Sequence, residues 1–121
     1  MQELTYNTFL VTGGAGFIGS HICGELLNQQ KQVICVDNLV AGKVVNIQEY
    51  MDNPNFRFVQ TDCVDIDPDY FRNVDVVFHN AASKCTVCEH DPELDLNVNA
   101  WGTFSVIKAA YRAGVKKVIH A

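Results

Sequence analysis

The sequence has little positive charge. Lysine and arginine together number 9 against 14 aspartates and glutamates, which gives a formal net charge of -5 at pH 7. A nucleic-acid-binding surface needs a concentration of basic residues to neutralise phosphates. The composition therefore argues against a nucleic-acid partner, and it is compatible with an enzyme that acts on small molecules.

The sequence also lacks a long hydrophobic run. No apolar stretch approaches the roughly 20 residues that a helix needs to span a bilayer. The segment from Met1 to Leu4 has neither the basic start nor the apolar stretch of a signal peptide. We therefore expect a cytoplasmic protein with no membrane partner.

Cysteine is present, but its pattern is irregular. Five cysteines, an odd number at uneven spacing, do not indicate a disulfide framework. Cys85 and Cys88 form a C-x-x-C pair with His90 nearby, but the sequence has no second such pair. A metal site needs further ligands, so we interpret the pair as a chance spacing and predict no metal site. The alternative, a redox or metal protein, is dismissed if thiol titration finds unreactive thiols and metal analysis finds no metal.

The length and composition are those of one folded domain. The chain has 121 residues, of which 48% are hydrophobic and 19% charged. This supports one hydrophobic core and excludes a disordered tail. We expect residues 1–121 to form a single domain.

Short β-branched or aromatic runs alternate with longer helical stretches. Strands are predicted at residues 8–11, 32–37, 56–60, 74–79 and 115–120. Helical segments are predicted at residues 17–30, 44–51, 67–69 and 92–113. In the last of these, apolar residues recur near helical spacing, with Tyr111 as the last of them. The first four are interpreted as a core face: Leu96, Ala100, Phe104 and Ile107.

This alternation predicts an α/β fold of the Rossmann type. Right-handed crossovers between strands produce a doubly wound parallel sheet, here of about five strands in the order 3-2-1-4-5. Ligands bind such sheets at the carboxyl ends of the strands where the order reverses. In this chain that point lies between the first and fourth strands.

A glycine-rich turn follows the first strand and opens the first helix. Gly13, Gly16 and Gly19 form G-x-x-G-x-x-G, and Gly14 with Gly16 and Gly19 forms G-x-G-x-x-G. Glycines permit the tight turn and the close approach of backbone to a pyrophosphate, which lies on the amino terminus of the helix. The strand–turn–helix context predicts a bound dinucleotide rather than a turn with no ligand.

Two carboxylates follow the next two strands. Asp37 ends the second strand, 18 residues after Gly19, where a carboxylate accepts hydrogen bonds from the adenine ribose. It would repel a 2′-phosphate, which favours NAD over NADP, although Lys43 nearby weakens this preference. Asp62, with Cys63 beside it, is placed to meet adenine. The alternatives are a helix N-cap or solvated strand end for Asp37 and a surface turn for Asp62.

Small residues follow the fourth strand. Ala81 and Ala82 let the backbone pass beside a cofactor, whereas His79 is interpreted as a structural residue at the end of the strand.

The chain resembles the extended short-chain dehydrogenase/reductases, especially nucleotide-sugar epimerases and dehydratases of the UDP-glucose 4-epimerase type. The matching stretches run in order through the chain, at residues 12–21, 36–39, 42–43, 61–62, 79–82, 84, 91–92, 97–99, 102–103 and 114–119. The resemblance implies NAD as cofactor, a nucleotide sugar as substrate of the full-length enzyme, and a possible homodimer.

The resemblance also implies roles for individual residues. Four would hold the pyrophosphate: Gly13, Gly16, Phe17 and Ile18. Four would hold adenosine, two at its ribose and two beside adenine: Asp37, Asn38, Asp62 and Cys63. Four would line the ribose and nicotinamide side or lie beside the cofactor on the long helix: Ala81, Ala82, Lys84 and Asn97.

One departure from the family concerns catalysis. The family uses a Tyr-x-x-x-Lys pair and a Ser or Thr after the fifth strand, with the tyrosine as acid/base. The tyrosines here are Tyr6, Tyr50, Tyr70 and Tyr111, and none has a lysine four residues later. We therefore predict no catalytic residue in this chain, and we interpret it as an incomplete NAD-binding domain, truncated after the fifth strand. The alternative is a stand-alone, non-catalytic NAD-binding or interaction module.

Overall fold

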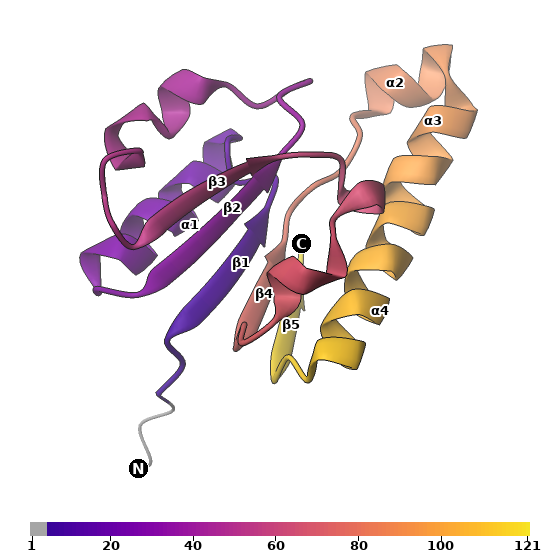
Figure 1. Cartoon of the computed structure of the whole chain (residues 1–121). Helices are drawn as coiled ribbons and strands as arrows, with labels where there is room; N and C mark the ends of the chain where they lie inside the picture. Colours follow the sequence, from indigo (N-terminus) through magenta and orange to yellow (C-terminus); the bar gives the residue numbers. More distant parts are fainter. Residues whose placement is uncertain (1–4) are drawn as a thin grey trace.

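Five parallel strands form one sheet at the centre of the fold (Figure 1). The computed structural model describes residues 5–121. The strands are β1 (Thr8–Thr12), β2 (Gln32–Asp37), β3 (Phe56–Gln60), β4 (Val76–His79) and β5 (Lys117–His120). Their spatial order is β3-β2-β1-β4-β5, and every neighbouring pair is parallel. The predicted doubly wound Rossmann-type sheet is confirmed.

Helices cover the two faces of this sheet (Figure 1). On one side lies α1 (Phe17–Asn28). On the other side, α3 (Pro92–Leu96), the π-helical turn η5 (Asn97–Gly102) and α4 (Thr103–Ala113) follow one another without a break. Gly114, with φ of 77°, ends α4 in the left-handed conformation that favours glycine.

Short elements complete the connections. These are α2 (Cys85–His90) and the 3-10 turns η1 (Val44–Asn46), η2 (Gln48–Tyr50), η3 (Cys63–Asp65) and η4 (Pro68–Phe71). The helix predicted at residues 44–51 is therefore two 3-10 turns, and α2 was not predicted. Strands β4 and β5 each begin two residues later than predicted, at Val76 and Lys117.

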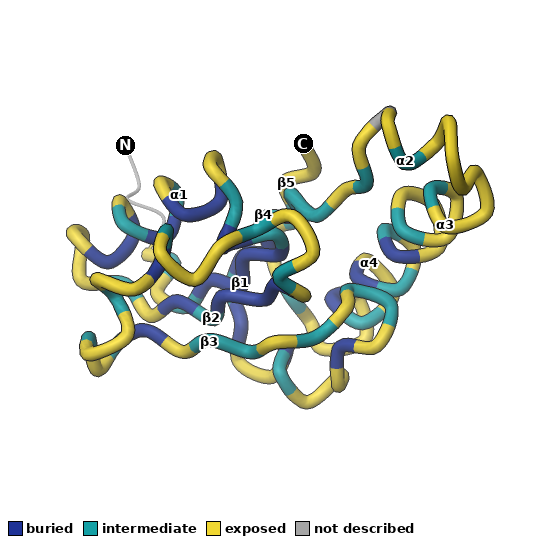
Figure 2. Tube along the Cα trace, turned by 90° about the horizontal axis from the view of Figure 1, so that it is seen from above, coloured by how far each residue is buried: buried dark blue, intermediate teal, exposed yellow. Residues whose placement is uncertain are grey.

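Side chains alternate between two hydrophobic clusters, one on each face of the sheet. Along β1, Phe9 and Val11 pack toward α1, and Leu10 packs toward the opposite face with Val106 and Ala110 of α4. This follows from the period of two in a strand. Figure 2 shows β1 and β2 as the most continuously buried part of the chain. Both faces of the central strands are covered, which explains their nearly uninterrupted apolar sequences.

The predicted core face of the long helix is wrong. Leu96, Phe104 and Tyr111 are exposed by 66%, 50% and 85%, and Ala100 and Ile107 are exposed as well. The face that packs on the sheet carries Gly102, Val106 and Ala110.

The close packing of this helix explains the error. The contact with η3 is too close for a large residue, since a Cβ atom at Gly102 would lie 2.6 Å from the sulfur of Cys63. Small residues therefore mark the buried face, and the large apolar side chains lie outside.

Two further results concern residues 5–121. No helix in this range is both long and apolar enough to cross a bilayer. No cluster of three or more histidine, cysteine, aspartate or glutamate side chains in the same range is arranged to hold a metal ion. Cys88 is an exposed thiol on α2, and the side chain of Cys85 lies outside the described part of the structure.

Candidate cofactor site

The glycine-rich turn brings β1 against the loop that follows β4. Gly13 has φ of 67°, and its N–H donates to the carbonyl oxygen of Val36 at 2.8 Å. A Cβ atom at Gly13 would lie 2.9 Å from the backbone nitrogen of Ala81. Both the backbone conformation and the close approach therefore require glycine at this position.

The amino terminus of α1 is open to a ligand. Gly16 is the N-cap residue and supplies no side-chain cap, and the first turn carries no acidic residue. The N–H groups of this turn, at Phe17 and Ile18, have no acceptor within the helix. Both side chains are exposed, by 80% and 65%. N–H groups without an acceptor in the helix and the positive end of the helix dipole suit this position to an anion.

Gly19 holds this helix close to the turn. A Cβ atom at Gly19 would lie 2.2 Å from the carbonyl oxygen of Gly13. The helix start and the turn are therefore one rigid cradle.

Asp37 lies beside the cradle at the carboxyl end of β2. Its carboxylate is buried and accepts hydrogen bonds from Ala15 N at 3.0 Å and Leu39 N at 2.8 Å. Asp37 is thus neither a helix N-cap nor a solvated strand end. Each carboxylate oxygen has lone pairs for a further donor, so a ribose hydroxyl can still be bound. Lys43 is exposed, and its backbone N–H donates to Ala15 O at 3.0 Å.

The two residues predicted to flank adenosine at β2 and β3 meet each other. The side-chain amide of Asn38 donates to Oδ1 of Asp62, and both residues are exposed. Cys63 is half-buried behind them. Burial and the neighbouring Asp62 carboxylate raise the pKa of the Cys63 thiol, which favours its protonated form.

The loop after β4 completes the site. The backbone N–H groups of Asn80 and Ala81 both donate to Thr12 Oγ1 at 3.2 Å, which fixes the loop beside the glycine-rich turn. Ala82 and Lys84 follow and are exposed. Within residues 5–121, the buried Nδ2 of Asn80 has no hydrogen-bond partner.

Asn97, which was predicted to lie beside the cofactor on the long helix, is the first residue of η5. It lines a shallow surface hollow on α3 and η5 with Glu93 and Trp101. Asn99 contacts the loop after β4, where its Oδ1 accepts a hydrogen bond from Ser83 N at 2.8 Å. Asn80 and Asn99 were not predicted as site residues, although both lie within the stretches that carry the family resemblance.

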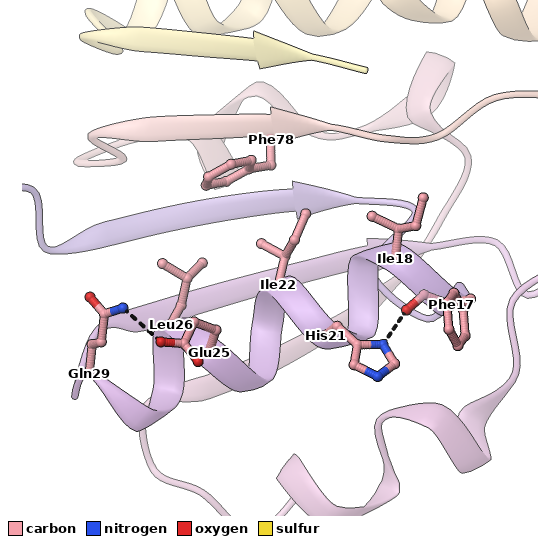
Figure 3. Close-up of a pocket in the computed structure, with 8 residues that line it drawn as sticks. All are labelled: Phe17, Ile18, His21, Ile22, Glu25, Leu26, Gln29 and Phe78. Atoms are coloured by element: carbon pink, nitrogen blue, oxygen red, sulfur yellow. Dashed lines mark hydrogen bonds between the residues drawn. The ribbon is translucent and has the colours of Figure 1, made fainter.

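A second, apolar groove runs along the flank of α1 (Figure 3). Figure 3 shows Ile22 and Leu26 of α1 on the same side as Phe78 of β4. The groove begins at Phe17 and Ile18, at the start of α1, and continues along the helix to Gln29. It therefore shares these two residues with the amino terminus of α1, and the rest of it lies away from the glycine-rich turn.

Comparison with known proteins identifies the family. Residues 9–121 match the model of the NAD dependent epimerase/dehydratase family. The chain belongs to this family. Among curated relatives it is similar to a putative UDP-glucose 4-epimerase of Methanocaldococcus jannaschii, with 38% identity over 93% of this chain and 36% of the relative. It is also similar to the UDP-glucose 4-epimerase of Mycolicibacterium smegmatis, with 39% identity over 92% of this chain and 37% of the relative.

Solved structures give the same result for the fold of this family member. A UDP-N-acetylglucosamine 4-epimerase from Methanobrevibacter ruminantium, in complex with UDP-N-acetylmuramic acid, has a TM-score of 0.86 at 30% identity, covering 95% of this chain and 37% of that one. A UDP-glucose-4-epimerase from Stenotrophomonas maltophila, with bound NAD and formylated UDP-arabinopyranose, has a TM-score of 0.83 at 31% identity, covering 96% and 36%. The chain therefore spans little more than a third of the length of these relatives.

The residues of this chain fit the NAD of the family. The glycine cradle has no room for a Cβ atom, the start of α1 has no capping side chain, and Asp37 presents an acceptor beside both. The buried amide of Asn80 adds a polar group without a partner in the described residues.

Proposed function

We propose that this chain binds NAD across the carboxyl ends of β1, β2, β3 and β4, as the cofactor-binding part of a nucleotide-sugar epimerase or dehydratase. One observation carries the proposal. The open start of α1, the glycine cradle and the buried carboxylate of Asp37 are joined into one unit by the hydrogen bond from Ala15 N to Asp37 Oδ2.

Each part of the unit matches one chemical group of the cofactor. The N–H groups of Phe17 and Ile18, next to Gly13 and Gly16, face the space for a pyrophosphate, whose charge the helix dipole stabilises. Asp37 accepts hydrogen bonds from the adenosine ribose. The remaining residues extend the site toward the ribose, adenine and the nicotinamide side: Asn38, Asp62, Cys63, Ala81, Ala82 and Lys84.

Asp37 also supports NAD over NADP. Its carboxylate is buried and already accepts two backbone hydrogen bonds, so it is held in place as an acceptor. A 2′-phosphate at this position would meet a fixed negative charge.

In such an enzyme, NAD held by these residues would supply reversible hydride transfer with a sugar carbon. The part of this chain is to bind and orient the cofactor. No tyrosine in the sequence has a lysine four residues later, so the family's acid/base pair does not lie within residues 1–121. His79 does not replace it, because its ring is buried and both nitrogens are hydrogen-bonded. A homodimer stays a prediction.

Calorimetric titration of the chain with NAD and with NADP tests the binding proposal. We expect one NAD site and weaker binding of NADP, and the absence of NAD binding by the folded chain would refute it.

Sequencing the transcript beyond the codon for Ala121 tests the assignment to an enzyme. A downstream Tyr-x-x-x-Lys supports it, and the protein made from that transcript is then assayed with UDP-sugars for epimerised or dehydrated product. A stop codon at that point supports the stand-alone module.

A further inference from the structure

His79 is a completely buried histidine at the carboxyl end of β4, between two threonine hydroxyls. Its relative exposure is 0%. Nδ1 lies 2.7 Å from Thr12 Oγ1, at the end of β1, and Nε2 lies 2.9 Å from Thr103 Oγ1, at the start of α4. The ring therefore connects the sheet to the helix that covers it.

The contacts of Thr12 determine the direction of the first hydrogen bond. Thr12 Oγ1 accepts from the backbone N–H groups of Asn80 and Ala81, each at 3.2 Å, and the N–H of Asn80 is shared with the backbone carbonyl oxygen of Thr12 at 3.3 Å. Because both N–H groups point at the lone pairs of the hydroxyl, its hydrogen is directed to Nδ1 of His79. In this arrangement Nδ1 carries no proton.

The contacts of Thr103 determine the direction of the second hydrogen bond, between Thr103 and Nε2 of His79. Thr103 Oγ1 donates to the backbone carbonyl of Asn99 at 2.7 Å, so it accepts from Nε2–H of His79. The side chain of Asn99 then reaches the loop after β4. Its Oδ1 accepts from Ser83 N at 2.8 Å, and its Nδ2 donates to Ser83 Oγ at 3.2 Å.

These bonds form a relay that reaches the same loop at two places. At one end Thr12 holds the backbone of Asn80 and Ala81. At the other, Thr103 holds the backbone carbonyl of Asn99, and the side chain of Asn99 holds the backbone of Ser83. Asp95 supports this second end, since its Oδ1 accepts from Asn99 Nδ2 at 3.1 Å and from Ser83 Oγ. This loop borders Gly13 and continues to Lys84.

We propose that His79 is a positioning residue: in its neutral Nε2–H form it completes a relay from Thr12 through Thr103 to Asn99 that clamps residues 80–83 against the glycine-rich turn, and its protonation releases this clamp and weakens NAD binding. The part that concerns NAD rests on the proposed function, and the relay itself does not.

Protonation breaks the relay because an imidazolium donates from both nitrogens. Nδ1–H would then point at Thr12 Oγ1, whose lone pairs are occupied. Within residues 5–121, the three groups described against the ring carry no negative charge: Thr12 on β1, Thr103 on α4, and His120 on β5, whose ring centroid lies 5.2 Å from that of His79. Burial and His120 lower the pKa of His79 to about 4, so the relay is intact at neutral pH.

Nitrogen NMR of the His79 ring in the whole chain, without NAD, is the primary test. We expect a neutral ring with the proton on Nε2 near neutral pH. A ring protonated on Nδ1 alone, or a charged ring, would overturn the proposal.

Two variants of Thr103 test the clamp. Thr103→Val keeps the branched shape and removes the hydroxyl, whereas Thr103→Ser keeps the hydroxyl and is the matched control. In Thr103→Val we expect faster hydrogen exchange at the amides of Asn80, Ala81 and Ser83, and an NAD dissociation constant raised roughly three- to tenfold, as for one lost hydrogen bond. Thr103→Ser should stay near the original chain on both readouts.

The outcomes distinguish the two proposals. Equal amide exchange and equal NAD affinity in the two Thr103 variants would refute the clamp. If the original chain does not bind NAD but the ring tautomer and amide exchange are as expected, the proposed function fails and the relay stands.

Discussion

The carboxylate of Asp37 accepts a hydrogen bond from the backbone N–H of Ala15 at 3.0 Å, across 22 positions of sequence. This bond joins the end of β2 to the turn after β1. The acceptor for the ribose and the cradle for the pyrophosphate are therefore not independent features, and a change at Asp37 alters both.

Replacement of Asp37 should change cofactor preference. In Asp37→Ala we expect NAD affinity to fall at least about tenfold, since hydrogen bonds to a charged group contribute roughly 1.5–3 kcal/mol. NADP should improve relative to NAD, because the negative charge that opposes a 2′-phosphate is gone. Asp37→Asn is the control that keeps one acceptor oxygen and should retain more NAD affinity. Calorimetry with both cofactors measures these values, and an unchanged NAD-to-NADP ratio in Asp37→Ala would contradict the role given to this residue.

Two glycines with the same backbone conformation form a matched pair. Gly13 and Gly114 have φ of 67° and 77°, but a Cβ atom meets Ala81 N at 2.9 Å in the first case and nothing within 4 Å in the second. Gly114→Ala should therefore cost about 1–2 kcal/mol of unfolding free energy, from backbone strain alone. Gly13→Ala adds a clash and should cost more.

The substitutions at Gly13 and Gly114 should also differ in their effect on NAD binding. We expect Gly13→Ala to weaken NAD binding because the loop at Ala81 must move, and Gly114→Ala to leave it unchanged. Urea unfolding and NAD titration of both variants check this. Equal effects of the two substitutions on binding would show that the close approach of Gly13 to Ala81 does not matter.

The chain should lose stability in mild acid because of His79. Burial and His120 lower the pKa of His79 from 6.5 to about 4 in the folded state. Between these values the unfolded chain binds a proton that the folded chain does not. The free energy of unfolding therefore falls as the pH decreases from about 6.5 to about 4. The contribution of His79 to this fall is on the order of 3 kcal/mol.

A histidine variant isolates this contribution. In His79→Gln the pH dependence of urea unfolding over this range should be flatter than in the original chain. The control is His90→Gln, at an exposed position on α2, which should leave the slope unchanged. A slope in His79→Gln as steep as in the original chain would count against a neutral, buried His79.

Asp75 should stabilise the amino end of the sheet. Its carboxylate accepts from Asn7 N at 2.8 Å, Thr8 N at 3.1 Å and the ammonium of Lys116 at 3.0 Å. These bonds lower its pKa below the usual carboxyl value, so its contribution is present above about pH 4 and is lost as the pH falls further. Asp75→Asn should cost roughly 1–3 kcal/mol at neutral pH.

Lys116 provides the control for Asp75. Its side chain is 59% exposed, so Lys116→Met should cost less than about 1 kcal/mol. Urea unfolding compares the two variants. If Lys116→Met costs as much as Asp75→Asn, the ion pair and not the backbone contacts is the source of the stabilisation.

Some features could be predicted because they follow from local chemistry. The turn after β1 needs glycine at Gly13, and this requirement is visible in the sequence. The strand order follows from the alternation of strands and helices together with the right-handed crossover. Asp37 was predicted because its position follows from the end of a strand.

Other features depend on contacts that no local pattern contains. The buried face of α4 could not be read from the sequence because it carries the small residues Gly102 and Ala110, and large apolar side chains lie outside. The contact of His79 with Thr12 joins residues 67 positions apart. Asn99 contacts Ser83 in the loop after β4, across 16 positions of sequence.

The central claim is that NAD lies on the glycine-rich turn, and an NMR titration of the isotope-labelled chain with NAD tests it most directly. The account predicts saturable shifts at the amides of residues 13–19, with smaller shifts at 37–38, 62–63 and 80–82. It is contradicted if the folded chain shows no shifts, or if the shifts fall on the flank of α1 around Ile22 and Leu26.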